Sequence, residues 1–280
     1  MVVKDINVAL IVHSCDSYEF LYQGFNYFFN KYWGNEINCN KYFASEELSV
    51  TFPNFTNIKS GKGEWSDRLR FLLEHKIKEP YVIYMQEDMW LTKTVNTNLV
   101  NELIELMAAK NWLQLKLHSS DAYKTASTGL YIEGYNVAEI DNELSGFLMS
   151  HQISIWNRNY LISQLHKNEH PWRNERKSTK RLKKLNPTIY HVDCFAENGQ
   201  TEINLNKNFI SRSEYFAVST NGMLNSNVLL FTNDLLQDYQ QKVYAEKLLS
   251  NYTNKITHNG KARPKKTDIF KRIKNLLTKK

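Results

Sequence analysis

Two adjacent carboxylates, Glu87 and Asp88, follow an apolar run, and together they could bind a cation. The run, residues 81–85, is entirely apolar or aromatic and begins after Pro80. A short apolar run of this kind predicts a strand buried on both faces. Because charged side chains rarely stay buried unpaired, we expect Glu87 and Asp88 where that strand leaves the core. Carboxylate oxygens there suit Mg²⁺ or Mn²⁺, and the alternative is a solvated turn.

A second polar stretch follows the first apolar run of the chain. Residues 6–12 predict a strand, and a helix is expected over residues 18–32. Ser14 and Asp16 lie between the two. Ligands of open α/β sheets bind at the carboxyl ends of strands, so both side chains are candidate ligand contacts. Asp16 could also cap the following helix.

The helix predicted over residues 65–76 starts with two further candidates, Trp65 and Arg68. Its apolar side chains recur at i, i+4, i+7 and i+8. Arg68 falls in the first turn, beside the place where a ligand at the sheet edge would lie. The alternative for Arg68 is a solvated side chain.

The remaining elements alternate between strands and helices. Strands are expected over residues 41–45, 112–117, 147–156 and 188–195, and helices over 98–110, 157–166 and 235–252. Residues 119–142 look irregular and polar, which is typical of a binding loop. This order predicts an α/β fold with a mostly parallel sheet sandwiched by helices. We expect it to fill residues 1–232, with a C-terminal helical extension over residues 233–280.

Composition excludes several classes of protein. The chain has no Gly-rich phosphate loop of either common pattern. Its three cysteines are odd in number and widely spaced, which favours reduced thiols in a cytoplasmic protein over a disulfide framework or a zinc cluster. No apolar run approaches the ~18 residues of a membrane span. We therefore expect a cytoplasmic protein without a signal peptide.

Positive charge is concentrated in the last residues. The formal net charge is +7, but residues 255–280 hold ten Lys or Arg and one acid, which leaves 26 basic and 28 acidic residues before them. This distribution argues against a nucleic-acid-binding fold. An apolar stripe within residues 267–277 predicts a basic amphipathic helix on the inner face of an anionic membrane. The alternative is a helix docked on the protein's own core.

Six segments, in this order and spacing, resemble bacterial and viral glycosyltransferases of the GT-A type, which build surface polysaccharides. The segments are residues 14–18, the aromatic helix that ends at residues 31–33, and residues 64–69, 81–91, 152–156 and 171–175. The resemblance implies a Rossmann-like sheet, a nucleotide-sugar donor held over its carboxyl edge, and a Mn²⁺ or Mg²⁺ cofactor.

The resemblance also implies roles for individual residues. Asp88 matches the metal ligand, while Gln86 stands where the family has the first Asp of its motif. His191, near Asp193, would be a late metal ligand or a merely hydrogen-bonded histidine. The implied contacts to the nucleotide sugar are Ser14, Asp16, Trp65, Arg68 and Glu87.

An inverting transferase also needs a general base to take the proton of the acceptor hydroxyl. Glu175 matches the family position best, and Glu169 is second. Trp172 would stack on an acceptor sugar, or else pack in the core. The basic run over residues 173–184 would contact phosphates of the donor or of a lipid-linked acceptor, or else form a solvated loop.

The sequence therefore predicts a glycosyltransferase that moves a sugar from a nucleotide-sugar donor to a glycan or lipid-linked acceptor. A sugar nucleotidyltransferase shares a similar sheet, but usually carries a Gly-rich loop after the first strand. A non-enzymatic adaptor that binds a membrane or nucleic acid through its tail would need no carboxylates at a strand end.

Overall fold

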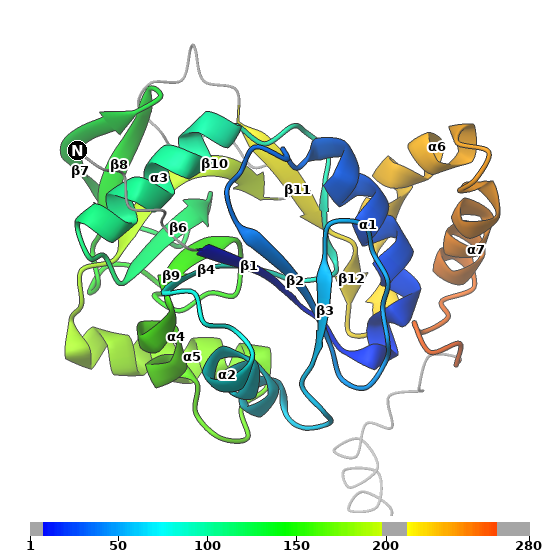
Figure 1. Cartoon of the computed structure of the whole chain (residues 1–280), viewed down its shortest axis with the longest axis horizontal. Helices are drawn as coiled ribbons and strands as arrows, with labels where there is room; N and C mark the ends of the chain where they lie inside the picture. The colour runs from blue at the N-terminus through cyan, green and yellow to red at the C-terminus, as the bar shows by residue number, and fades with distance from the viewer. Residues whose placement is uncertain (1–7, 198–211, 262–280) are drawn as a thin grey trace, which may run out of the picture. The chain divides into compact units, whose positions relative to one another are not determined.

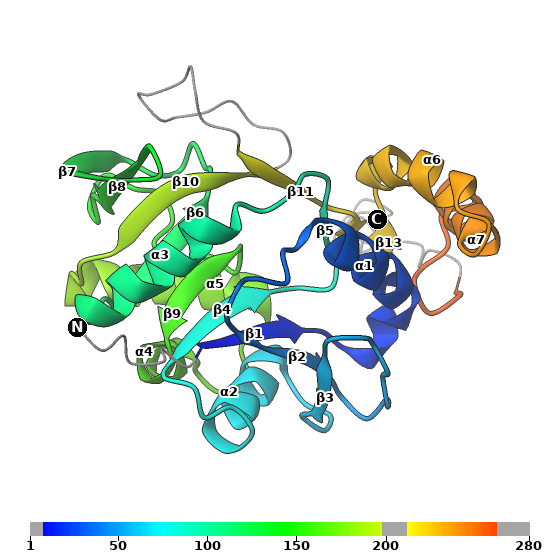
Figure 2. The same ribbon diagram turned by 45° about the horizontal axis from the view of Figure 1, so that its top comes forward.

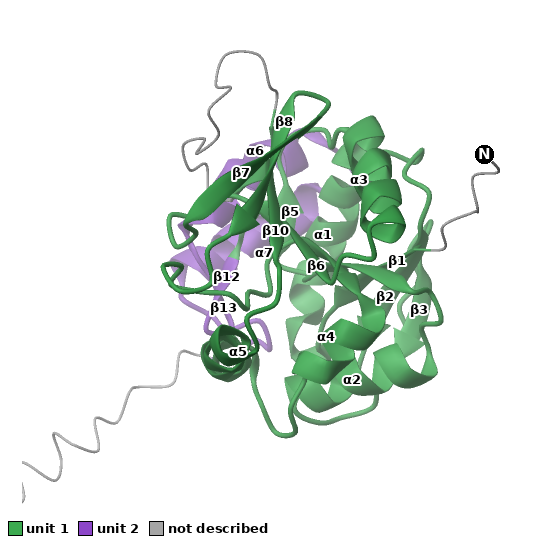
Figure 3. Cartoon of the chain, turned by 90° about the vertical axis from the view of Figure 1, so that its left-hand side faces the viewer, with its two compact units in different colours: residues 1–218 green, residues 219–280 purple. Residues whose placement is uncertain are grey.

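The chain divides into two compact units, residues 1–218 and residues 219–280 (Figure 3). The computed structural model describes residues 8–197 and 212–261. The predicted amphipathic helix over residues 267–277 lies outside these ranges. The expected domain boundary after residue 232 stays a prediction.

The first unit is built on an 11-stranded sheet (Figure 1). Nine of its strands follow one path, β3-β2-β1-β4-β9-β6-β10-β11-β5, and a hairpin of β7 and β8 joins through β10. Figure 2 shows this hairpin beside β10. The strands are β1 (Val8–His13), β2 (Asn40–Ser45), β3 (Thr56–Lys59), β4 (Tyr81–Met85), β5 (Met89–Leu91), β6 (Gln114–His118), β7 (Thr125–Ile132), β8 (Tyr135–Ile140), β9 (Ser154–Asn157), β10 (Tyr190–Glu197) and β11 (Ser213–Ala217).

Most strands on this path run in one direction. β3, β2, β1 and β4 pair in parallel, and so do β6, β10 and β11. Between these groups, β9 is antiparallel to both β4 and β6. Because β9 reverses the direction twice, the carboxyl ends of β4 and β6 lie at the same edge. The predicted α/β fold with a mostly parallel sheet is confirmed.

Helices cover both faces of the sheet. They are α1 (Glu19–Tyr32), α2 (Trp65–His75), α3 (Thr97–Ala109), α4 (Arg158–Gln164) and α5 (Pro171–Leu185). In Figure 3, α3 lies above the plane of β1, β2 and β3, and α2 and α4 lie below it. Buried residues of α2, α4 and α5 share one apolar cluster with alternate residues of β1 and β4. This alternation follows from the two-residue period of a strand.

Trp90 ties α1 to the strand that follows the two carboxylates. Its ring is fully buried and stacks on Phe28 of α1, with the ring centroids 5.6 Å apart. A Cβ at Gly24 would lie 2.1 Å from Trp90 Cη2, so only glycine lets the helix and the indole approach this closely. The indole N–H donates to the Glu87 carbonyl oxygen at 3.1 Å. Packing of α1 therefore positions the backbone of Glu87.

Several predicted elements are wrong. Residues 119–142 contain the β7–β8 hairpin, and the strand expected from residue 147 begins only at Ser154. The basic run after residue 173 is helical, in α5. The helix expected over residues 235–252 is two helices, α6 (Leu229–Gln237) and α7 (Lys242–Thr253).

The second unit holds α6 and α7, together with a small two-stranded sheet of β12 (Ser219–Thr220) and β13 (Met223–Leu224). A hydrogen bond of 2.7 Å joins Ser219 Oγ to His258 Nε2 and closes the end of this unit on its start. Within residues 8–197 and 212–261, no helix has the length and hydropathy needed to cross a membrane.

Candidate functional site

The turn after β4 presents Glu87 and Asp88 at the edge of the sheet. The N–H of Met89 donates to the Gln86 carbonyl oxygen at 3.2 Å, and the N–H of Val218 donates to the Asp88 carbonyl oxygen at 3.0 Å. Together with the indole bond to Glu87, these contacts fix the backbone on both sides of the two carboxylates. The backbone that carries the two side chains is therefore fixed by the fold.

The two carboxylates lie in surroundings that disfavour negative charge. Burial raises the pKa of Glu87 well above its usual range, and the neighbouring charge of Asp88 raises it further. Arg68 is close enough to lower the pKa of Glu87 in part. Burial also raises the pKa of Asp88, to about 6. Because both groups lack enough compensating charge, a bound cation would be stabilised here.

The donor set fits a metal ion that arrives with a phosphate ligand. Within the described part of the chain, no three or more His, Cys, Asp or Glu side chains are grouped to hold a metal ion. Glu87 and Asp88 therefore do not form a cage made of protein alone. Mg²⁺ is commonly held by one or two carboxylates, with substrate phosphates completing its coordination. The pair fits that mode of binding.

Asp16 organises the loop that follows β2. Its carboxylate accepts hydrogen bonds from the backbone N–H groups of Glu46 at 2.9 Å, Glu47 at 2.9 Å and Leu48 at 3.1 Å. The prediction that Asp16 caps the first helix is wrong, since the residue before α1 is Tyr18 and its side chain makes no cap. Asp16 thus shapes the edge of the site through the loop.

Ser14 is buried between β1 and β2. Its hydroxyl lies 2.6 Å from the Ala44 carbonyl oxygen and 2.8 Å from the Tyr22 hydroxyl. Its own carbonyl oxygen accepts a hydrogen bond of 2.8 Å from Arg68 Nη1. The Ser14 side chain is thus occupied by the protein, and any ligand contact here would involve the neighbouring backbone.

Arg68 joins two loops beside the carboxylates, although a first-turn arginine is usually solvated. Besides its bond to Ser14, its Nε lies 3.6 Å from Glu46 Oε1. The side chain is buried, so its charge acts at short range on Glu87. The alternative of a solvated Arg68 is therefore wrong.

Trp65 packs at the centre of an aromatic and histidine cluster. Its ring centroid lies 4.2 Å from that of His151, 5.7 Å from that of His13 and 6.4 Å from that of Tyr84. The ring is buried, so Trp65 is a packing residue of this cluster.

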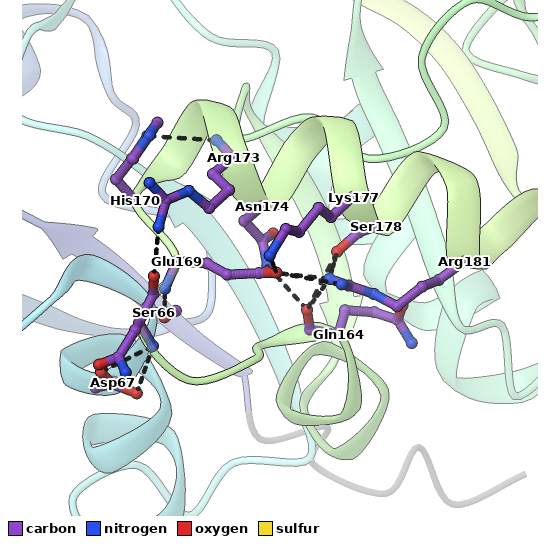
Figure 4. A network of polar contacts seen from close by, with 11 residues as sticks. Ser66, Asp67, Gln164, Glu169, His170, Arg173, Asn174, Lys177, Ser178 and Arg181 are labelled. Carbon is purple, nitrogen blue, oxygen red and sulfur yellow. Dashed lines mark hydrogen bonds and ion pairs between the residues drawn. The ribbon is translucent and has the colours of Figure 1, made fainter.

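Glu169 is held in a polar network between α2, α4 and α5 (Figure 4). Its carboxylate lies 2.8 Å from Asn174 Nδ2, 3.1 Å from Arg181 Nη2 and 3.4 Å from Lys177 Nζ. Burial works to raise the pKa of Glu169, but Arg181, Asn174 and Lys177 together lower it. A carboxylate held this way keeps its charge and is a weak base, so the geometry favours a structural role.

Glu175 and Trp172 lie in the first turns of α5. Glu175 Oε1 accepts a hydrogen bond of 3.0 Å from the backbone N–H of His151. Burial raises the pKa of Glu175, while that hydrogen bond and the charge of Lys116 lower it in part. Trp172 is 59% exposed, so the alternative of a core residue is wrong.

A buried basic cluster around β6 was not predicted. Lys116 is fully buried, and its Nζ lies 3.1 Å from the Tyr123 hydroxyl, which in turn lies 2.7 Å from His118 Nε2. Burial lowers the pKa of Lys116 to about 7, and the charge of Glu175 raises it in part. A lysine and a histidine inside an apolar run, at positions 116 and 118, were the available signal.

Within the described residues, His191 is not grouped with Glu87 and Asp88 in a set of metal ligands. Its Nε2 lies 2.9 Å from the His118 carbonyl oxygen, so Nε2 carries the proton and donates it. Burial lowers the pKa of His191 to about 4, which keeps the ring neutral. Its neighbour Asp193 forms a buried ion pair with Arg212. No grouping with Asp88 into a set of three potential ligands occurs in the described ranges.

The predicted residues therefore form two groups that meet at His151. Arg68, Glu87 and Asp88 line the edge formed by β1, β2 and β4. Glu175 lies on the other side, against Lys116. The His151 ring packs on Trp65 of the first group, and its backbone N–H binds Glu175.

No family model matches the chain, and no curated protein matches it. Among solved structures, the crystal structure of S. aureus TarS 1–349 is similar with a TM-score of 0.46 and 11% identity, covering 89% of this chain and 71% of that one. TarS 1–349 in complex with UDP-GlcNAc has a TM-score of 0.46 and 12% identity, covering 89% and 72%. The UDP complex has a TM-score of 0.47 and 10% identity, covering 89% and 71%. These TM-scores lie below 0.5, so the likeness carries no argument about the function of this chain.

Proposed function

We propose that this chain is a glycosyltransferase that uses a nucleotide-sugar donor and a divalent metal ion, Mn²⁺ or Mg²⁺. One observation carries the proposal. The Glu87–Asp88 pair lies at the carboxyl end of a buried central strand, with both pKa values raised and a buried arginine, Arg68, beside it. Ligands of open α/β sheets bind at this edge.

The charges of the pair and of Arg68 complement a metal-bound diphosphate. Glu87 and Asp88 would hold the metal ion, and Arg68 would attract the phosphates from the first turn of α2. A metal ion held there would supply Lewis-acid stabilisation of the charge that develops on the departing nucleotide. This arrangement also explains why two desolvated carboxylates are retained at one turn.

Glu175 would act as the general base of an inverting transfer. It would accept the proton of the acceptor hydroxyl while the oxygen attacks the anomeric carbon and the bond from that carbon to the phosphate oxygen breaks. Burial raises the pKa of Glu175, which makes it a better proton acceptor than a solvated carboxylate. Exposed Trp172, three residues earlier, would stack on the acceptor sugar.

A thermal-shift screen tests the donor site. UDP-, GDP-, CMP- and dTDP-sugars would each be added with Mn²⁺ or with EDTA to wild type, to Asp88→Asn and to Asp121→Asn, an exposed carboxylate that serves as the matched control. A donor at about 100 times its Kd should add about 2.7 kcal/mol of stability. We expect a metal-dependent shift with one nucleotide class, present in the control and lost in Asp88→Asn. No shift with any donor would refute the proposal.

We also propose that residues 255–280 bind an anionic membrane surface, because ten of the 36 basic residues lie there. A chain ending at Asn254 should bind anionic vesicles more weakly and retain turnover on a water-soluble acceptor. Loss of turnover with unchanged vesicle binding would contradict this part of the proposal.

A further inference from the structure

Positive charge in the first unit is concentrated on one helix, α5. This helix of 15 residues holds seven Lys or Arg and one acid. The other residues before position 255 hold 19 Lys or Arg and 27 Asp or Glu. A helix of net charge +6 is thus placed on a body whose remaining charge is −8. Such an asymmetry produces a local positive potential despite the acidic surroundings.

Most charges of α5 point away from the core. At 3.6 residues per turn, all seven fall within an arc of about 160°. Asn174, Ser178 and Leu182 fall outside this arc and are buried. Like charges spaced three and four residues apart destabilise a helix, so this face is costly when nothing covers it.

Only the edge of this charged face is neutralised by the protein. Arg181 and Lys177 turn toward Glu169, as Figure 4 shows. Arg176, Lys180 and Lys184 are exposed, and among the described residues none of them forms an ion pair. These three cations form what we call the outer row of α5.

We propose that the outer row of α5 binds an extended anionic chain, and that this chain is the acceptor. The helix carries Trp172 and Glu175 in its first turns, and the outer row continues from them toward its C-terminus. From Trp172 to Lys184 the helix rises about 18 Å, enough to contact several charges of a linear polymer. The acceptor role rests on the proposed function, whereas the binding of the anion does not.

The structure favours a polyanionic chain over a membrane as the partner of α5. A helix that lies in a bilayer interface inserts an apolar face. In α5 the neutral and apolar side faces the protein, and its large exposed apolar residues are Trp172 and Leu185, at opposite ends. The outer face therefore offers charge and little apolar surface to insert.

Binding of model polyanions to the full chain tests the proposal. The probes are medium-chain inorganic polyphosphate, poly-glutamate and vesicles containing phosphatidylglycerol. The outer-row triple variant, Arg176→Gln, Lys180→Gln and Lys184→Gln, is compared with a charge-matched control, Lys31→Gln, Lys78→Gln and Lys110→Gln, whose lysines are also exposed. Because the basic residues after position 254 are common to both variants, the difference between the variants isolates α5.

We expect the outer-row variant to bind polyphosphate or poly-glutamate at least tenfold more weakly than the control. Its slope of log affinity against log salt should be smaller by about 2 to 3, as expected when three charge contacts are lost. Hydrogen exchange should show that the polyanion protects residues 171–185. The preferred probe distinguishes a phosphate chain from a carboxylate chain.

The same variants separate this proposal from the transferase proposal. With an anionic acceptor, the outer-row variant should raise the KM of the acceptor and leave the KM of the donor unchanged. If the protein transfers no sugar but the binding difference holds, the transferase proposal fails and the anion site stands. Equal weakening in both variants, or a selective loss of vesicle binding alone, would overturn the anion site.

Discussion

Asp88→Asn should stabilise the protein when metal is absent and abolish its metal-dependent stabilisation by a donor. The reason is that the fold holds the ionised Asp88 carboxylate in buried surroundings, next to Glu87. Asparagine has nearly the same shape and carries no charge. A substitution that stabilises the fold while removing ligand response is the behaviour expected of a residue kept for function.

The magnitude follows from the pKa of Asp88, which burial raises from 3.8 to about 6. At about 1.4 kcal/mol per unit, the ionised group costs the folded state up to about 3 kcal/mol at pH 7. Because the folded pKa is raised, the folded state holds the proton more tightly than the unfolded state. Stability from this group is therefore fully present below pH 4 and is lost as the pH rises from about 4 to 6.

Urea denaturation in EDTA would measure this effect. The stability advantage of Asp88→Asn over wild type should be largest at pH 7 and should shrink as the pH falls toward 4. Glu79→Gln is the control, because Glu79 is also buried but accepts hydrogen bonds from Asn40 at 2.7 Å and Tyr42 at 2.9 Å. Burial works to raise the pKa of Glu79, yet its hydrogen bonds lower it overall, so this substitution should destabilise.

The result that would refute the reasoning is a loss of stability in Asp88→Asn at pH 7 comparable to that of Glu79→Gln. It would mean that the Asp88 carboxylate serves the fold. A pH-independent gain would also contradict the explanation, because the cost assigned to Asp88 exists only when the group is ionised.

Three further predictions concern the network around Glu169, the proposed base Glu175, and the packing of Gly24 against Trp90. Glu169→Ala should cost about 1 to 3 kcal/mol in urea denaturation, because it leaves the buried Asn174 amide and the partly buried Arg181 guanidinium without their carboxylate; no measurable cost would contradict the network. Glu175→Gln should lower kcat about 10² to 10⁴-fold in a transfer assay and remove the acid limb of the pH profile, with the KM of the donor unchanged. Gly24→Ala should destabilise by about 1 to 3 kcal/mol, since the new Cβ would overlap the Trp90 ring; unchanged thermal stability would show that the ring moves aside at no cost.

Local patterns were sufficient to predict the turn that presents the carboxylates. The run of residues 81–85 is apolar at every position, and the strand it predicts, β4, is buried along its whole length. The charged residues that follow had to lie where the strand ends. The same reasoning located Ser14 and Asp16 after β1, although their side-chain partners in β2 and its loop are about 30 residues away and had no local signal.

Hydrophobic periodicity did not predict the structure correctly where polar side chains are buried. The strand predicted over residues 112–117 alternates Leu113, Leu115 and Leu117 with other residues, a pattern that gives no sign that Lys116 is buried. In the structure β6 is a central strand covered on both faces, so Lys116 is buried too. Helix α5 was missed because its buried side includes Asn174 and Ser178, which carry no hydrophobic pattern. Pro171 at its first position was the signal available.

The position of Glu169 explains why a buried charge is retained away from the proposed chemistry. Its backbone N–H donates to Ser66 Oγ at 3.0 Å, and its carbonyl oxygen accepts from the Ser66 N–H at 3.1 Å. Its carboxylate, meanwhile, binds three side chains of α5. One residue thus clamps the first turn of α2, which carries Arg68, to the helix that carries Glu175. Hydrophobic packing could join the same helices, but it would allow them to slide, whereas directional bonds from one carboxylate set the spacing between the proposed donor side and the proposed base.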